Sequence, residues 1–270
     1  MALRLLVAHS AAERDAAREV EAKVFLQAFG NTPDVMEQEY GPYDDRSRFI
    51  TVIDDAAGSA LGVARLLLPD DAGALKTLID VAGEPWHLSV PDTLRAEGLS
   101  GRPVWDVASL AVDRRYRSGA AGAEVMLALC HGIYRYTLFS GVDGLVTILD
   151  DRVLRLVRVM GGPWAPMAGA SSRYYLGSPA STPCICRVDS IAESIRTRRP
   201  DLARAAVDGE FRSISMDPAD LLPSRGGPVP AAPAHSRSSR PMPPRRDTSG
   251  LKPPTHRRPD ALLGSPNPTA

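Results

Sequence analysis

The chain has 270 residues, 44% of them hydrophobic, and its 32 basic side chains balance 32 acidic ones. This zero net charge argues against an obligate nucleic-acid-binding protein, because such domains are usually basic enough to displace counterions from phosphates. The odd count of three cysteines argues against a disulfide framework, and no apolar run reaches the roughly 18 residues of a membrane-spanning helix, so we expect a reduced, cytoplasmic protein without an integral membrane segment.

Strand and helix patterns alternate along residues 1–217, which is typical of an α/β or α+β domain. In chain order we expect a strand at 3–8, a helix at 10–29, a hairpin of strands at 48–54 and 60–68, a strand at 104–113, a helix at 121–139, a strand at 144–149, a helix at 151–160, strands at 166–170 and 184–188, and a helix at 190–206. Ser10 and Glu13 form a capping box at the start of the first helix. The pattern predicts a sheet covered by helices.

The composition changes at residue 218. Of the 24 prolines, 13 lie between Pro218 and Pro268, and residues 218–270 carry 8 basic against 3 acidic side chains. Such a segment buries too little apolar surface to offset its ordering entropy, so we expect a folded domain at 1–217 and a disordered tail at 218–270. The tail is either a basic tether for an acidic partner or a solvated extension, and a cut after Asp217 is expected to leave the melting temperature unchanged.

Several residues stand in an order that is typical of one group of enzymes. They are Phe25, Glu39, Tyr43-Asp44, the run Gly62–Leu67 and the run Trp105–Asp113. Their order and spacing resemble those of acyl-homoserine-lactone synthases and the related N-acyl amino acid synthases over residues 3–190, and the order of elements resembles the GNAT acyltransferase superfamily. The lactone synthases' Glu-x-Asp-x-x-Asp motif here has Gly41 in its middle, and their Glu-x-x-Arg motif becomes Asp106 through Ser109. The resemblance is therefore closer for the acyl-donor side than for the acceptor side.

The resemblance implies a GNAT-like central mixed sheet flanked by helices. It also implies an N-acyltransferase that moves an acyl group from acyl carrier protein or acyl-CoA, as co-substrate, to the amine of a small acceptor such as an amino acid, with no permanently bound cofactor. Two alternatives stay open. One is an acyl-homoserine-lactone synthase, and the other is a catalytically inactive GNAT-like binding protein.

Acyl transfer to an amine needs a group that accepts the amine's proton. Asp106 occupies the place of the resembling family's glutamate on the predicted strand at 104–113, so it is our first candidate; the alternative is a carboxylate that ties this strand to a neighbouring loop. Glu39 and Asp44 are candidates for recognising the acceptor's ammonium group, or else lie on a solvated loop. Arg65 stands among apolar residues, and we expect it to pair with one of these two acids.

A basic, glycine-containing loop before a helix suits the phosphates of a thioester donor. Residues 114–122 match this description, and the candidate donor-binding residues are Arg114, Arg115, Arg117, Gly119 and Gly122. The three arginines also suit the acidic surface of an acyl carrier protein, whereas the alternative is a solvated basic turn. Backbone amides from Ser109 to Ala111 are candidates for stabilising the oxyanion.

The cysteines do not form a convincing metal site. Cys184 and Cys186 lie on one face of a predicted strand, but no second pair of cysteines or histidines accompanies them, so we expect them to pack in the core. His131 interrupts the apolar pattern of the helix at 121–139 and is expected on the face of that helix. No metal is predicted.

Overall fold

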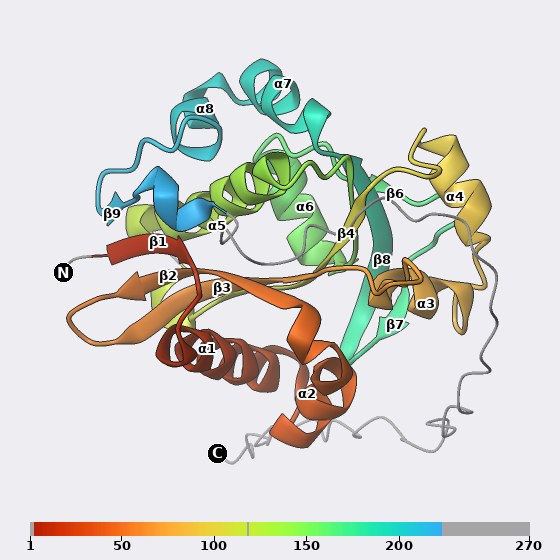
Figure 1. Cartoon of the computed structure of the whole chain (residues 1–270), viewed down its shortest axis with the longest axis horizontal. Helices are drawn as coiled ribbons and strands as arrows, with labels where there is room; N and C mark the ends of the chain where they lie inside the picture. The colour runs from red at the N-terminus through yellow and green to blue at the C-terminus, as the bar shows by residue number, and fades with distance from the viewer. Residues whose placement is uncertain (1–2, 118, 223–270) are drawn as a thin grey trace, which may run out of the picture. The chain divides into compact units, whose positions relative to one another are not determined.

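The structure, a computed structural model, describes residues 3–117 and 119–222. Within them nine strands form one mixed sheet (Figure 1). The strands are β1 (Leu3–Val7), β2 (Ser47–Asp54), β3 (Ser59–Leu67), β4 (Val104–Val112), β5 (Gly144–Asp150), β6 (Ala165–Pro166), β7 (Arg173–Tyr175), β8 (Ser178–Arg187) and β9 (Ile214–Ser215). The helices are α1 (Ala11–Phe29), α2 (Pro33–Tyr40), α3 (Lys76–Ala82), α4 (Val90–Ala96), α5 (Gly119–Phe139), α6 (Asp151–Val159), α7 (Asp189–Arg198) and α8 (Pro200–Ala206), with short 3-10 helices η1 (Gly41–Arg46), η2 (Arg114–Tyr116) and η3 (Pro218–Leu221).

The strands lie in the order β6-β8-β5-β4-β3-β2-β1-β9, with β7 beside β8. Neighbours are antiparallel except for two parallel pairs, β4 with β5 and β1 with β9. The predicted fold class, a mixed sheet flanked by helices, is confirmed.

Helices α1 and α5 cover opposite faces of this sheet (Figure 1). The alternation of side chains along β1 shows this directly, since Leu5 packs in the core on the α5 side and Leu6 packs with α1. Helix α5 approaches β2 so closely that a Cβ at Gly132 would lie 2.5 Å from the Ile50 side chain. Only glycine fits at that crossing.

The parallel pairing of β4 and β5 is short. It runs from Val104 opposite Gly144 to Asp106 opposite Val146, and beyond that point the two strands separate. On its other edge β4 pairs with β3 through a bulge, because Arg65 lies opposite Ser109 while Leu66 lies opposite Val107. Ala108 is therefore an extra residue in β4, at the point where the strand leaves β5.

Apart from the strand at 166–170 and the helix at 190–206, the predicted strands and long helices are confirmed. So is the capping box of α1, in which Ser10 Oγ accepts from the Glu13 amide and the Ser10 amide donates to Glu13. Three short helices, α2, α3 and α4, lie where no element was predicted. The prediction of a single helix at 190–206 is wrong, because Pro200 divides this segment into α7 and α8. The strand expected at 166–170 is also wrong, since β6 ends at Pro166.

The end of the described chain packs against the domain. Helix η3 follows Asp217, the Leu221 side chain is 1% exposed, and Asp220 accepts a 3.2 Å hydrogen bond from Arg4. The folded part therefore continues beyond the predicted boundary at Asp217, and the expectation that a cut there is harmless is replaced below. The rest of the predicted tail lies outside the described residues. Within 3–117 and 119–222, no helix is long and apolar enough to span a bilayer.

Leu221→Ala in the full chain is expected to lower the melting temperature by several degrees, because it removes a fully buried side chain worth about 2–5 kcal/mol. Leu222→Ala is the matched control, since Leu222 is 43% exposed. Differential scanning calorimetry measures both, and a cut after Asp217 should reproduce the Leu221 effect. Equal melting temperatures for the two variants would show that η3 does not contribute to stability.

Candidate functional site

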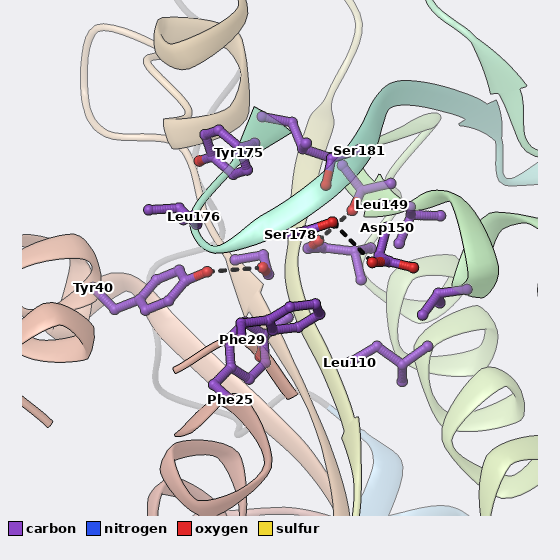
Figure 2. A pocket seen from close by; sticks show the side chains of 16 residues that line it. Phe25, Phe29, Tyr40, Leu110, Leu149, Asp150, Tyr175, Leu176, Ser178 and Ser181 are labelled. Atoms are coloured by element: carbon purple, nitrogen blue, oxygen red, sulfur yellow. Dashed lines mark hydrogen bonds between the residues drawn. The ribbon is translucent and has the colours of Figure 1, made fainter. Parts of the chain in front are cut away.

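The separation of β4 and β5 opens a cavity of about 70 Å³ between them (Figure 2). Its walls come from both strands, from the end of α1, from α2, and from the turn between β7 and β8. Aromatic rings form much of one side, contributed by Phe25, Phe29, Tyr40 and Tyr175. We call this space the splay cavity.

A larger groove of about 830 Å³ adjoins the splay cavity. It lies between the end of α1, the first half of α5 and helix α6, and most of its lining is apolar. Five residues line both spaces: Phe25, Phe29, Leu110, Asp150 and Val153. The two spaces therefore adjoin each other along these residues, and we call the larger one the apolar groove.

Six hydroxyl side chains line the splay cavity, and five of them donate their proton into the protein. Two donate to backbone carbonyls, Tyr40 to Ala108 at 3.2 Å and Thr147 to Val107 at 2.7 Å. Three donate to carboxylates: Ser109 to Glu21, Tyr175 to Asp80 at 2.5 Å and Ser178 to Asp150 at 2.8 Å. A hydroxyl whose proton is committed in this way has only lone pairs left to offer. Apart from Ser181, the hydroxyls of the cavity wall therefore accept hydrogen bonds rather than donating them.

Asp106 lies beneath this cavity and lines neither space. Its side chain is 0% exposed, and it accepts a 2.6 Å hydrogen bond from the Thr77 amide and a 2.9 Å bond from the Thr77 hydroxyl. Burial raises the pKa of the Asp106 carboxyl to about 6, although the two bonds from Thr77 oppose this shift. The geometry matches the alternative in which Asp106 ties its strand to a neighbouring segment, here the first turn of α3.

Helix α3 also carries a buried lysine at the edge of the site. Lys76 Nζ lies 2.6 Å from Asp80, 2.9 Å from Glu39 and 2.9 Å from the Tyr175 hydroxyl. Burial alone lowers the pKa of the Lys76 ammonium, but Tyr175, Asp80 and Glu39 outweigh it and hold the pKa above its usual value. Glu39, a predicted acceptor-binding residue, therefore faces Lys76 and does not line the cavity.

Arg65 forms a second buried ion cluster on the other side of Tyr40. It contacts Glu21 at 2.6 Å and, as predicted, pairs with one of the two candidate acids, Asp44, at 3.7 Å. Its guanidinium also lies 4.9 Å from the centre of the Tyr40 ring. Arg65 and Asp44 therefore support the wall of the splay cavity from behind and line neither space.

Glu21 is the residue that sequence reasoning missed. Its side chain is buried, it pairs with Arg65, and it accepts the proton of Ser109, which lines the cavity. A signal was present in the sequence, because Glu21 falls on the buried stripe of α1 with Ala17 and Val24. A charged residue on an apolar stripe needs a partner of opposite charge.

The predicted donor loop lies partly at the mouth of the apolar groove. Arg117, Gly119 and Gly122 line the groove, and the Arg117 Nε donates to the Val112 carbonyl at 2.7 Å. A Cβ at Gly122 would lie 2.2 Å from the carbonyl oxygen of Tyr116, so only glycine allows the loop to pack against the start of α5. These three residues are brought together as expected.

The other predicted donor residues lie outside both spaces. Arg115 folds back onto Asp113 at 3.0 Å, and neither Arg115 nor Arg114 lines the groove. Ala111 is buried on the α1 side of β4, whereas Ser109 lines the splay cavity. In the described part of the chain, no group of three or more His, Cys, Asp or Glu side chains is placed to hold a metal ion.

No family model and no curated protein matches this chain. Among solved structures, the fold is similar to that of FeeM, an N-acyl amino acid synthase from uncultured soil microbes, with a TM-score of 0.54 and 14% identity over 71% of this chain and 93% of FeeM. It is also similar to the CoA-dependent acyl-homoserine lactone synthase BjaI (TM-score 0.46, 16% identity, 80% of this chain and 93% of BjaI). The synthase LasI gives a TM-score of 0.44 and 15% identity over 78% of this chain and 98% of LasI.

The likeness to FeeM shows the fold. The predicted resemblance to N-acyl amino acid synthases is confirmed at that level, because the chain covers 93% of FeeM at 14% identity. What the site does must be argued from its own residues.

Asp106→Asn is expected to change how stability depends on pH. A carboxyl with a pKa of about 6 in the folded state and about 3.9 when unfolded binds more protons in the folded state between these values, so the wild type loses about 2–3 kcal/mol as pH rises from 4 to 7. Because asparagine does not titrate, the stability of the variant should not fall in this way as pH rises. Melting temperatures of both proteins, measured from pH 4 to 7, test the prediction. If the two plots of melting temperature against pH run parallel, Asp106 does not titrate in this range.

Proposed function

We propose that this protein is an N-acyltransferase that moves an acyl group from a thioester donor to the amine of a small acceptor. The donor is carried by acyl carrier protein or coenzyme A, and the acceptor is a small amine such as an amino acid. The proposal is supported by two adjoining spaces of different chemistry, which share wall residues where β4 and β5 separate.

The main observation behind the proposal is that five hydroxyls of the splay cavity donate their protons into the protein and keep lone pairs free. An amine offers N–H donors, and these five hydroxyls offer lone pairs to them. Asp150 also lines the cavity, but its carboxylate is already bonded to Arg152 and Ser178. An unpaired carboxylate there would attract the protonated amine, which cannot attack a carbonyl. Hydroxyl oxygens suit the neutral amine that the reaction needs.

The apolar groove suits the donor. A pantetheine arm is a long, narrow chain that ends at the thioester, and the acyl group beyond it is apolar, so the donor fits a mostly apolar groove that runs from the start of α5 to the separated strands. Arg117 lies at the α5 end of this groove, where it can meet a phosphate of the donor. The bulge at Ala108 leaves β4 irregular beside the reacting centre, and an amide between Ser109 and Ala111 is our candidate for binding the oxyanion.

The chemistry is then a direct transfer. The amine nitrogen forms a bond to the thioester carbonyl carbon, the carbon–sulfur bond breaks, the thiolate takes up a proton, and the amine loses one. Most of the acceleration comes from holding the two reactants in line. Two routes for the amine proton are proposed: through water to Asp106, or to the Ser109 hydroxyl, which passes its own proton to Glu21.

The function is tested by incubating the pure protein with acyl-CoA and acyl carrier protein thioesters of several chain lengths and with mixed amines, and by reading the products by mass spectrometry. An N-acyl amine and a free thiol are expected. An acyl-homoserine lactone formed only with S-adenosylmethionine would favour the lactone synthase, and donor binding without any product would favour the inactive binding protein. Ala123→Trp, which narrows the groove from an exposed position, should weaken donor binding at least tenfold, whereas Ala12→Trp on the exposed start of α1 should not.

The two proton routes are separated by comparing Ser109→Ala with Asp106→Asn. Because Ser109 lines the cavity and Asp106 does not, we expect Ser109→Ala to lower single-turnover rates about a hundredfold with little change in donor affinity. Asp106→Asn should mainly change stability. The reverse result, a hundredfold loss in Asp106→Asn with a normal melting temperature, would assign the proton to Asp106.

A further inference from the structure

A third hollow of about 330 Å³ lies away from the splay cavity and shares no lining residue with it or with the apolar groove. It is bounded by the second half of α5, by α7, and by the segments that follow α8 and β9. Figure 1 shows these elements together on the α5 side of the sheet. Nothing in the proposed acyl transfer uses this hollow.

The hollow contains an unusual buried group. The His131 side chain is 1% exposed and lines the hollow, and neither of its ring nitrogens makes a hydrogen bond of normal geometry to residues 3–117 or 119–222. Packing holds the ring in place, because Phe211 meets it edge-on at 5.8 Å and a Cβ at Gly209 would lie 2.7 Å from its Nε2. The backbone of Ala206 and Val207 comes near the ring without completing a hydrogen bond of normal geometry, so the imidazole can still bond to a ligand in the hollow.

The charges around the hollow do not cancel. Arg196 pairs with Asp208 at 2.8 Å, whereas Arg135 has no carboxylate partner among the described residues and lies 4.5 Å over the Phe139 ring. Burial lowers the pKa of His131 to about 4, so the ring is neutral at pH 7 and offers one N–H donor and one acceptor. The positive charge of Arg135 is therefore not balanced by a carboxylate of the described residues.

The remaining walls are apolar. They are formed by Phe139, Val207, Met216 and Leu221. A ligand that matches all three features has one negative charge for Arg135, an oxygen that accepts from His131, and a short apolar body. The volume is at the lower end of the range for small-molecule sites, which limits the size of that body.

We propose that this hollow binds a small organic anion, a monocarboxylate with a short apolar chain, with the carboxylate at Arg135 and His131. A single carboxylate balances the one uncompensated guanidinium and can accept from both groups. A phosphate dianion leaves one charge unbalanced and has no apolar part to cover Phe139 and Met216.

The probe is octanoate, titrated into the full-length protein by calorimetry and by NMR of labelled histidine. We expect saturable binding with a shift of the His131 ring signals, and at least tenfold weaker binding in Arg135→Gln. Arg198→Gln is the matched control, because Arg198 is exposed on α7 and does not line the hollow. It should bind octanoate as the wild type does.

Each other outcome overturns the proposal. Equal binding of 1-octanol would show that the hollow selects apolar bulk and not an anion, and binding of inorganic phosphate in place of octanoate would exclude a carboxylate site. Octanoate binding that Arg135→Gln leaves unchanged would place the probe elsewhere, for example in the apolar groove. No binding at all would leave His131 satisfied by water only.

Discussion

The structure depends on the early end of the backbone pairing between β4 and β5. After Asp106 and Val146 the strands separate, so the backbone of β4 loses its partner on one side and its polar groups must be satisfied in another way. Side-chain hydroxyls supply part of this replacement, since Thr147 donates to the Val107 carbonyl and Tyr40 to the Ala108 carbonyl. The same bonds that repair the open strand also leave the cavity wall with lone pairs facing inward. The hydrogen bonds that stabilise the open strand and the acceptor character of the cavity wall therefore have one structural cause.

Behind this wall, two buried cations pair with carboxylates in separate clusters. Arg65 with Glu21 and Lys76 with Asp80 are each buried, and both cations lie near the Tyr40 ring, at 4.9 and 5.6 Å from its centre. Breaking such a pair costs about 3–5 kcal/mol, because it leaves a buried charge uncompensated. Neither cation lines the splay cavity. The clusters therefore support Tyr40 and Tyr175 without placing a cation in the wall of the cavity.

The strands and long helices were predictable from the sequence because their side chains repeat with a clear period over many residues. The helices α2, α3 and α4 have only seven or eight residues each and no such period, so tertiary contacts decide them. The site divides in the same way. Arg117, Gly119 and Gly122 follow from local loop chemistry, whereas the partners of Asp106 and Tyr175 lie on α3, at sequence separations of 29 and 95 residues. No local pattern carries that information.

Asp150 shows how the two spaces are held together. It is the titratable residue that lines both of them, and its carboxylate accepts bonds from the Arg152 amide, from the Arg152 guanidinium and from the Ser178 hydroxyl. These bonds use the acceptor positions of both oxygens and hold the pKa of Asp150 below its usual value against the effect of burial, so it is a poor proton acceptor. Its bonds instead join the end of β5, the start of α6 and the start of β8. Asp150 therefore fixes three elements at the place where the two spaces meet. In the proposed transfer, the acceptor would be selected by its fit between Tyr40, Tyr175 and this corner.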